Sequence, residues 1–492
     1  MPESWTLTVR MKKVWLLWWS CLSLSAHCST EPGVVMRVTQ KWLDYIRKGG
    51  LEVFRHLLLH DSLPNIIGST HLFGRVEYAI TGIFVLEFNT SLVVAVPVPP
   101  TDVHLTVEGA KAKVYGQWAI KHWLIKDSGS FSLVISGVSL AAQLTTFKDS
   151  SSRPAVSLSA CYSEVHEAKL HLSGGASWFY NLFTGFLEKP IKNNLNQKLC
   201  PNVNDVLKIL QKELTTFQVT ANLDAHHKIA YGLISPPRVN TTHIDLHLKG
   251  TAQYTGAEER DFNTVPLILP ETTTSMMLVG LSEHFFNTLG KTYFMSAILK
   301  LELTQEQYPN VFWLRTGDYG SIIPQMNNYY PVSEAMILTV RATKPPVVHL
   351  TSQLTMDIEG ELQALVVLPN LITKEVFSVP VGTTLVADAI HLLNQNLTIS
   401  FNIERFQFYE FSSAVGPINV TKLEVSLGQS LQESILHAIN NGLQGGFPMP
   451  ILDNVTLQES AISITPGCLV VSMDMDYIPW SRLIGTVPKA WS

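Results

Sequence analysis

Two histidine pairs are the first residues whose type and spacing could do chemistry. His56 and His60 lie four positions apart within a helical pattern, which is a spacing used by metal ligands, but no third ligand follows nearby. His226 and His227 are adjacent, and neighbouring residues of a strand point to opposite faces, so they make a poor joint site. We therefore expect no metal site at either pair.

The common catalytic motifs are also missing from the sequence. It has no Gly-X-Ser-X-Gly nucleophile elbow and no His-Glu-X-X-His pair. Gly290-Lys291-Thr292 has the ending of a phosphate-binding loop, but the position where that loop needs its first glycine is Phe285. These observations favour a protein that is not an enzyme and that uses no cofactor.

The cysteine positions indicate one disulfide. Of the five cysteines, Cys21 and Cys28 fall within a targeting segment described below, which leaves Cys161, Cys200 and Cys468. In an oxidising compartment Cys161 and Cys200 are the natural pair, because both lie in the first half of the chain and Cys468 lies far along the second. Cys468 opens an apolar strand pattern, and we expect it to be a buried free thiol.

The N-terminal residues have the organisation of a secretory signal peptide. Three basic residues precede the apolar run 14–24, and small residues follow near a cleavage site at Ser29. We assign residues 1–28 to this segment, with Met11 as an alternative start, and expect a secreted protein. Asn-X-Ser/Thr sequons fit glycosylation in the secretory pathway. They begin at Asn89, Asn240, Asn396, Asn419 and Asn454.

Charge and composition exclude some partners. Residues 30–229 carry 19 lysines and arginines against 16 acidic residues, and residues 230–492 carry 13 against 23. Neither half has the basic balance of a nucleic-acid-binding domain, so we exclude DNA and RNA as partners. Hydrophobic residues make up 46% of the chain and charged residues 15%. This apolar excess must be buried in a core or used to bind an apolar partner.

Apolar periodicity predicts helices and strands in the first half. Residues 35–58 carry apolar side chains at helical spacing and are predicted to form a long amphipathic helix. From 66 to 172 the pattern changes to the alternation of an extended antiparallel sheet. A second helix is predicted over 178–199, and a further helical pattern covers 203–214.

The middle of the chain is predicted to be a crossing between two halves. Residues 227–250 contain Pro236-Pro237, which a central strand does not tolerate, followed by an alternating run typical of a half-buried strand. Because 492 residues exceed what one core usually organises, we expect two lobes. The predicted parts are a first lobe over 29–226, the crossing, a second lobe over 251–477, and a tail over 478–492.

The second half repeats the plan of the first. A short helix over 281–290 is predicted to end at Gly290, and a last helix covers 431–443. Strands are predicted where apolar residues alternate; these segments are 299–303, 362–366, 399–403, 423–427, 455–457 and 469–477. The predicted fold class is therefore α+β.

Six stretches of the chain form a pattern of landmarks. They are Pro-Gly-Val-Val at 32–35, Tyr-Gly-Leu-Ile-Ser-Pro-Pro at 231–237, the segment 280–290, Val-Leu-Pro-Asn at 367–370, Gly-Phe-Pro-Met-Pro at 446–450 and Asp-Tyr at 476–477. Together with the cysteine pair they resemble the family of bactericidal/permeability-increasing protein, lipopolysaccharide-binding protein and the plasma lipid transfer proteins, closest to the first branch. The resemblance implies an elongated boomerang of two twisted antiparallel β-barrels wrapped by long helices and joined by a central antiparallel sheet.

The same resemblance implies an apolar pocket in each lobe that holds the acyl chains of a bound phospholipid, without a cofactor. Periodicity does not show such a pocket, because a filled core gives the same pattern. The candidate lipid-binding residues are Val35, Val38, Trp42, Tyr45, Ile46, Leu182, Phe186, Tyr231, Leu233, Phe285 and Phe286.

The resemblance implies a secreted lipid-binding protein, with lipid transfer or recognition of lipopolysaccharide or a membrane surface in innate defence as further functions. The chain departs from the bactericidal members in charge, because its first half nets only +3. The lysines at corresponding positions are Lys111, Lys113, Lys121, Lys126 and Lys148. We therefore expect weak lipopolysaccharide binding. The alternative is a secreted interaction protein that uses the same fold to recognise a receptor, with lipid only as a structural component.

Overall fold

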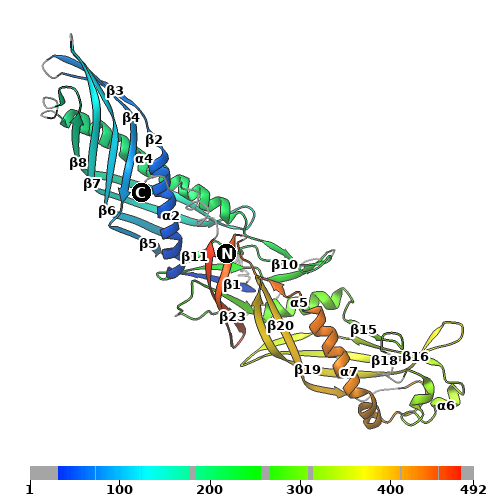
Figure 1. The fold of residues 1–492 in the computed structure, drawn as a ribbon. Helices are drawn as coiled ribbons and strands as arrows, with labels where there is room; N and C mark the ends of the chain where they lie inside the picture. Colours follow the sequence, from blue (N-terminus) through cyan, green and yellow to red (C-terminus); the bar gives the residue numbers. More distant parts are fainter. Residues whose placement is uncertain are drawn as a thin grey trace, which may run out of the picture.

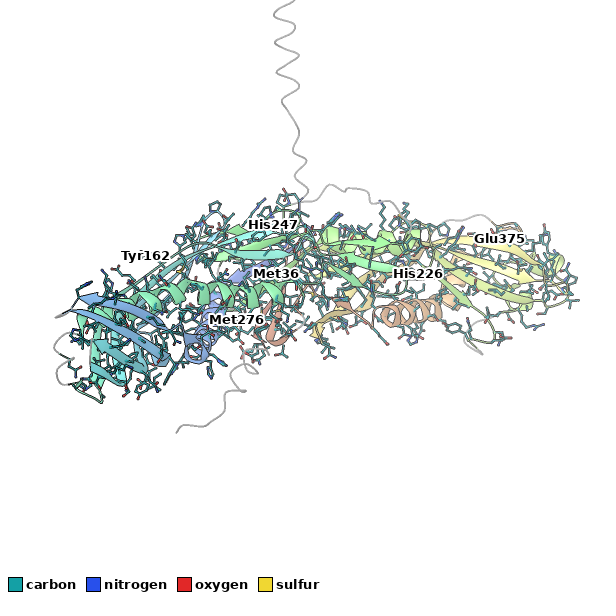
Figure 2. All side chains as sticks on the ribbon, turned by 90° about the horizontal axis from the view of Figure 1, so that it is seen from above. Met36, Tyr162, His226, His247, Met276 and Glu375 are labelled. Carbon is teal, nitrogen blue, oxygen red and sulfur yellow. A yellow bond between two sulfur atoms is a disulfide. The ribbon has the colours of Figure 1, made fainter. Side chains whose placement is uncertain are left out.

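The molecule is long and narrow, with two lobes placed end to end (Figure 1). The computed structural model describes residues 31–71, 74–122, 125–177, 181, 184–255, 266–271, 273–308, 314–409, 413–452 and 454–477. The predicted signal segment, the predicted tail and Leu182 lie outside these residues. Seen from above, Tyr162 marks the first lobe, Met36 the middle and Glu375 the second lobe (Figure 2).

The first lobe is built on a curled antiparallel sheet. Within the described ranges it has seven strands in the order β2-β4-β6-β7-β8, with β3 also paired to β4 and β5 to β6. They are β2 (Ser62–Leu63), β3 (Ile66–His71), β4 (Arg75–Asn89), β5 (Leu92–Val98), β6 (Asp102–His122), β7 (Ile125–Lys148) and β8 (Pro154–Ser173). Alternate residues such as Phe131, Leu133 and Ile135 on β7 are buried. The sheet therefore has one apolar face that needs a cover.

Two helices cover the apolar face of this sheet, α2 (Gln40–His60) and α4 (Gly185–Leu214) (Figure 1). The helical patterns predicted over 178–199 and 203–214 belong to one continuous helix from Gly185 onward. The predicted disulfide is confirmed: Cys161 on β8 is bonded to Cys200 on α4, with their Cα atoms 5.9 Å apart. The bond ties the longer helix to the last strand of the sheet.

A central antiparallel sheet joins the lobes, as the resemblance implied. Its described strands run in the order β11-β12-β1-β14-β23-β22. They are β11 (Arg238–Val239), β12 (His243–Leu248), β1 (Val34–Thr39), β14 (Met277–Ser282), β23 (Cys468–Tyr477) and β22 (Val455–Thr465). Strands from the beginning, the middle and the end of the chain therefore meet in one sheet. Every residue of β1 is buried, because this strand lies inside the sheet and both of its faces are covered.

The second lobe repeats the combination of a curled sheet and covering helices. Its described sheet has the order β15-β16-β18-β19-β20-β21, with β17 paired to β18. The strands are β15 (Lys300–Leu303), β16 (Ala335–Ala342), β17 (Val347–Leu350), β18 (Leu354–Val367), β19 (Thr373–Leu393), β20 (Asn396–Phe408) and β21 (Phe447–Pro448). The helical segments are α5 (Glu283–Met295), η2 (Thr316–Tyr319), α6 (Met326–Tyr329) and α7 (Val420–Gly442). A smaller sheet of β9 (Thr220–Asn222), β10 (His227–Ala230) and β13 (Thr251–Tyr254) lies beside α5.

The helix predicted from residue 35 onward is wrong over its first turn. Residues 34–39 form strand β1, and the helix begins only at Gln40. The run Val-Val-Met-Arg-Val-Thr is rich in β-branched residues, which favour a strand. Val35 and Val38 therefore lie on a strand and point to opposite faces of the central sheet.

Two further predictions in the second half are wrong. Gly290 does not end a helix, because α5 continues to Met295 and Gly290 lies where its backbone approaches Pro346 closely. Residues 423–427 are not a strand but belong to α7, whose N-terminus is capped by Asn419 Oδ1 accepting a hydrogen bond from Lys422 N. Leu423 and Leu427 are buried at helical spacing, while Val425 between them is 82% exposed.

None of the helices in the described parts of the chain is both long and apolar enough to cross a membrane.

Candidate functional site

A cavity of about 260 Å³ lies where the first lobe meets the central sheet. Its walls come from α2, α4, the sheet of the first lobe, the central sheet including Val455 at the start of β22, and the segment 450–452. A single water needs only about 10–15 Å³ of such space, so this volume is far larger than an ordinary packing defect. The cavity is therefore a compartment of the fold.

Helix α2 forms one wall because its apolar residues recur at helical spacing. Leu43, Phe54 and Leu58 are buried against the sheet, and Trp42 and Ile46 lie beside them on the cavity wall. Gly50 also lines the cavity, and a side chain there would meet Val206 of α4 at 3.7 Å. The two helices thus approach each other closely over the cavity.

Helix α4 forms the second helical wall. Its lining residues follow a regular helical stripe, namely Leu199, Val203, Val206, Leu207, Leu210 and Leu214. This stripe begins next to Cys200, whose disulfide fixes the helix to β8. The bond therefore holds one wall of the cavity against the sheet that forms another.

The third wall comes from the central sheet and from the far end of the chain. Met36 and Val38 of β1 line the cavity, whereas Val35 lies on the other face, in a separate cluster with Leu278 and Val470. The segment 450–452 adds Pro450, Ile451 and Leu452. Residues from both halves of the sequence are therefore needed to close the cavity.

The cavity wall is almost entirely apolar. Arg47 on α2 is the only ionisable side chain among the described residues that line it, and Thr146 is the only hydroxyl. The Thr146 hydroxyl donates to Thr101 O at 2.8 Å, so its proton already has an acceptor. Such a wall excludes water and attracts hydrocarbon, because it offers water almost no hydrogen bonds.

Three of the predicted lipid-binding residues line this cavity: Val38, Trp42 and Ile46. Tyr45 lies on the same helix but does not line it; its hydroxyl accepts a hydrogen bond from Tyr477 N at 2.9 Å. Val35 lies on the other face of the central sheet, as described above. Leu182 lies outside the described residues, and the position of the Phe186 side chain also lies outside what the structure describes.

The other four predicted lipid-binding residues form a packed cluster between the central sheet and the second lobe. Tyr231, Leu233, Phe285 and Phe286 are all buried. The Tyr231 hydroxyl donates to Pro448 O at 2.7 Å, and burial raises its pKa well above the usual range. Phe285 and Phe286 contact each other and Phe447 edge to face. They do not line the cavity of the first lobe, and the pocket expected in the second lobe stays a prediction.

The side chains of Asp224, His227 and Ser296 contact one another in a row, an arrangement that is also found in proton relays. His227 Nδ1 lies 2.8 Å from Asp224 Oδ2, and its Nε2 lies 3.0 Å from Ser296 Oγ. The Ser296 hydroxyl also has a backbone acceptor, Tyr293 O, at 2.9 Å, while burial and Asp224 raise the pKa of Tyr293 to about 12. The contacts among Asp224, His227 and Ser296 connect the β9–β10 hairpin to the C-terminal end of α5.

The histidine pair on α2 shows no metal geometry. His56 Nδ1 and His60 Nδ1 lie 3.0 Å from each other. Burial and the neighbouring His60 lower the pKa of His56. Among the residues that the structure describes, no cluster of three or more His, Cys, Asp or Glu side chains has the arrangement of a metal site.

Sequence reasoning missed the α4 stripe as a cavity wall, the wall segment 450–452, and Arg47. The α4 stripe was recognised only as a helical pattern. Nothing in the sequence connects residue 450 with residue 47. For Arg47 a signal did exist: it lies four residues after Leu43 and seven before Phe54, so a charge interrupts an apolar helical stripe.

Fold and cavity together define a class of protein: two curled antiparallel sheets, each covered by helices, joined by a central sheet and holding an apolar compartment. Comparison with known families makes the assignment specific. The N-terminal domain of the LBP / BPI / CETP family matches residues 42–211, and the C-terminal domain of the same family matches residues 221–477. The chain belongs to this family, whose members bind lipids and lipopolysaccharide.

Individual relatives match over nearly the whole chain. BPI fold-containing family C protein from Homo sapiens is 29% identical, over 93% of this chain and 92% of the relative. Bactericidal permeability-increasing protein from Sebastes schlegelii is 27% identical, over 91% of this chain and 96% of the relative. A crystal structure of lipopolysaccharide binding protein matches with a TM-score of 0.66 and 26% identity, covering 91% of this chain and 99% of that chain. These matches confirm the predicted family and fold class.

Proposed function

We propose that the protein is a secreted, non-enzymatic lipid-binding protein that holds the acyl chains of a phospholipid-type molecule in the cavity of its first lobe. The observation that carries this proposal is the nearly complete absence of polar groups from the described wall of that cavity. Acyl chains bind such a wall without directional contacts, so specificity for chain length is expected to be loose. The Val38, Trp42 and Ile46 side chains are the predicted lipid contacts that the geometry favours.

The driving force is the removal of hydrocarbon from water. Each buried methylene contributes about 0.8 kcal/mol, so one acyl chain contributes on the order of 10 kcal/mol before the costs of ordering it. This is enough for stable binding without any charged partner. The disulfide supports the proposal, because it keeps α4 positioned over the sheet while the cavity is loaded.

Lipopolysaccharide is a second ligand that the family suggests, and the surface charges of the first lobe support only weak binding. Two of the five lysines considered are near carboxylates: Lys113 Nζ lies 3.8 Å from Glu87 Oε1, and Lys121 Nζ lies 3.8 Å from Glu77 Oε2. These pairs reduce the local positive charge that a phosphorylated lipid would meet. We propose that the acyl chains of lipopolysaccharide can enter the cavity, while its phosphates add little binding free energy.

Secretion and glycosylation are part of the same proposal. Asn89, Asn240 and Asn419 are exposed, as an attached glycan requires. Asn396 and Asn454 are half-buried, and their side-chain nitrogens donate to Gly445 O and to Glu213 Oε2, each at 3.0 Å. A glycan on either of these two side chains would displace a hydrogen bond of the folded protein.

Mass spectrometry of organic extracts tests the proposal on protein purified from a secreting cell line. We expect co-purifying acyl lipid in wild-type protein and a large loss of it in V206W, because the indole would occupy the cavity. V425W is the matched control, since it makes the same change on an exposed helical position. Wild-type protein that is folded but carries no lipid, and that takes up none from vesicles, would refute the proposal.

A transfer assay then separates a carrier from a static binder. Donor vesicles with labelled phospholipid are mixed with acceptor vesicles and the protein. Transfer that depends on protein concentration supports a carrier. Lipid that co-purifies but never exchanges supports the alternative in which lipid is a structural component of an interaction protein.

A further inference from the structure

One cation lies on the wall of an otherwise uncharged cavity. Arg47 is the sole ionisable side chain among the described lining residues, and the exposed fraction of its side chain is 19%. It therefore borders both the cavity and the solvent. A charged group bordering hydrocarbon is costly unless it is paired, so its partners decide what it does.

Arg47 lies on the seam between α2 and β5. Within the described residues β5 pairs only with β6, which leaves its other edge facing α2. Two side chains of α2 satisfy carbonyls on that edge: Gln40 Nε2 donates to Ala95 O at 2.8 Å, and Arg47 Nη1 donates to Val93 O at 2.8 Å. In the part of the lobe that the structure describes, no backbone ladder closes this side, so at the seam the cavity wall depends on side chains.

The guanidinium keeps hydrogen-bonding capacity after these contacts. Its Nε lies 3.4 Å from Asp44 Oδ1, longer than the roughly 2.7–2.9 Å of a good charge-assisted hydrogen bond. The Asp44 side chain is also 46% exposed, so this pair is weak. Nη2 has no hydrogen-bond partner among the described residues. Arg47 therefore has donors available for a ligand.

We propose that Arg47 binds the phosphate of a phospholipid whose acyl chains fill the cavity, and that it makes phospholipids preferred over uncharged lipids with the same chains. This inference rests on the proposed function. A guanidinium presents several donors in a planar fork that matches phosphate oxygens. An acyl lipid seated in the cavity with its polar end at the α2–β5 seam brings its phosphate to Arg47, the one charged residue among the described lining residues.

The test compares dioleoyl phosphatidylcholine with dioleoylglycerol, which has the same two acyl chains, and with oleate, which is one such chain ending in a carboxylate. Delipidated full-length protein is incubated with vesicles that contain each radiolabelled lipid, and the protein-bound fraction is measured. R47Q is expected to bind the phosphatidylcholine at least about tenfold more weakly than wild type, the lower end of the value of one lost hydrogen bond to a charged group. Dioleoylglycerol binding is expected to change less than about twofold, because it depends on apolar burial.

Control variants separate a phosphate contact from a structural role. R55Q changes an exposed arginine on the same helix and should leave all three lipids unaffected. R47K keeps the positive charge but loses the planar set of guanidinium donors, so it should lose less phosphatidylcholine binding than R47Q. D44N should bind phosphatidylcholine at least as tightly as wild type, because it frees the guanidinium from Asp44.

Two results would overturn this inference. An equal loss of dioleoylglycerol and phosphatidylcholine in R47Q would mean that Arg47 only supports the wall. A loss of oleate binding with phosphatidylcholine binding unchanged would assign Arg47 to a carboxylate instead. Wild-type protein that binds none of the three lipids contradicts the proposed function itself, which is a different outcome.

Discussion

Removing lipid from the cavity should lower the stability of the first lobe by a measurable amount. An empty cavity in a protein core costs about 24 cal/mol per Å³. For a volume of about 260 Å³ the cost is about 6 kcal/mol. In a unit of about 150–250 residues each kcal/mol shifts the melting temperature by about 2–4 °C. We therefore expect the delipidated protein to begin unfolding about 12–24 °C below the loaded protein.

Differential scanning calorimetry checks this, with delipidated protein, protein reloaded from phospholipid vesicles, and V206W as samples. V206W should unfold at a higher temperature than delipidated wild type, because its indole occupies part of the cavity. V425W changes an exposed position, so its unfolding temperature should equal that of wild type in the same lipid state. If the delipidated and reloaded proteins unfold within about 2 °C of each other, cavity filling contributes no stability, and the reasoning from volume to stability is refuted.

Four further predictions concern the covalent and charged features of the chain. C161A should lose about 4 kcal/mol of unfolding free energy in urea titrations, from the chain entropy of the loop it opens. Burial raises the pKa of Cys468 to about 12, so its thiol stays protonated at pH 8 and iodoacetamide should modify it only after unfolding. Glycopeptide mapping should find glycans at Asn89 and Asn419 and not at Asn454, whose side-chain nitrogen donates to another residue. Lipopolysaccharide binding should be weak and fall steeply between low and high salt, and salt-independent tight binding would contradict the charge argument.

Sequence patterns predicted most strands of the sheets because one face of each strand is buried. In β7 the alternation of Phe131, Leu133 and Ile135 is visible in the sequence and buried in the structure. The failures occurred where two periods fit the same residues. Leu423 and Leu427 fit both a strand with alternating residues and a helix with a four-residue spacing, and only the Asn419 cap distinguishes them.

The start of α2 shows a second cause of error. Val35, Val38 and Trp42 have helical spacing by coincidence, because a strand that ends at Thr39 runs directly into a helix that begins at Gln40. No glycine or proline separates the two elements. Burial of β1 on both faces depends on β12 and β14, which come from distant parts of the chain. Local periodicity does not contain that information.

The cavity itself was beyond sequence reasoning for a related reason. Apolar residues at regular spacing need an apolar partner, and the pattern is the same whether that partner is another side chain or an acyl chain. Trp42 and Ile46 line the cavity, whereas Phe285 and Phe286, equally apolar, pack against Phe447. What distinguishes them is the spacing between α2, α4 and the segment 450–452, which only the three-dimensional structure provides.

The structure also separates the source of affinity from the source of selectivity. Apolar burial of one acyl chain provides on the order of 10 kcal/mol before ordering costs and is available to any lipid with such a chain. The proposed hydrogen bond from Arg47 to a charged head group would add about 1.5–3 kcal/mol and would be available only to some lipids. If the proposed binding mode is correct, loss of the cavity should abolish binding, whereas loss of Arg47 should change which lipid is bound. A single substitution at Arg47, the one charge on the described cavity wall, is therefore expected to change lipid preference while the cavity stays intact.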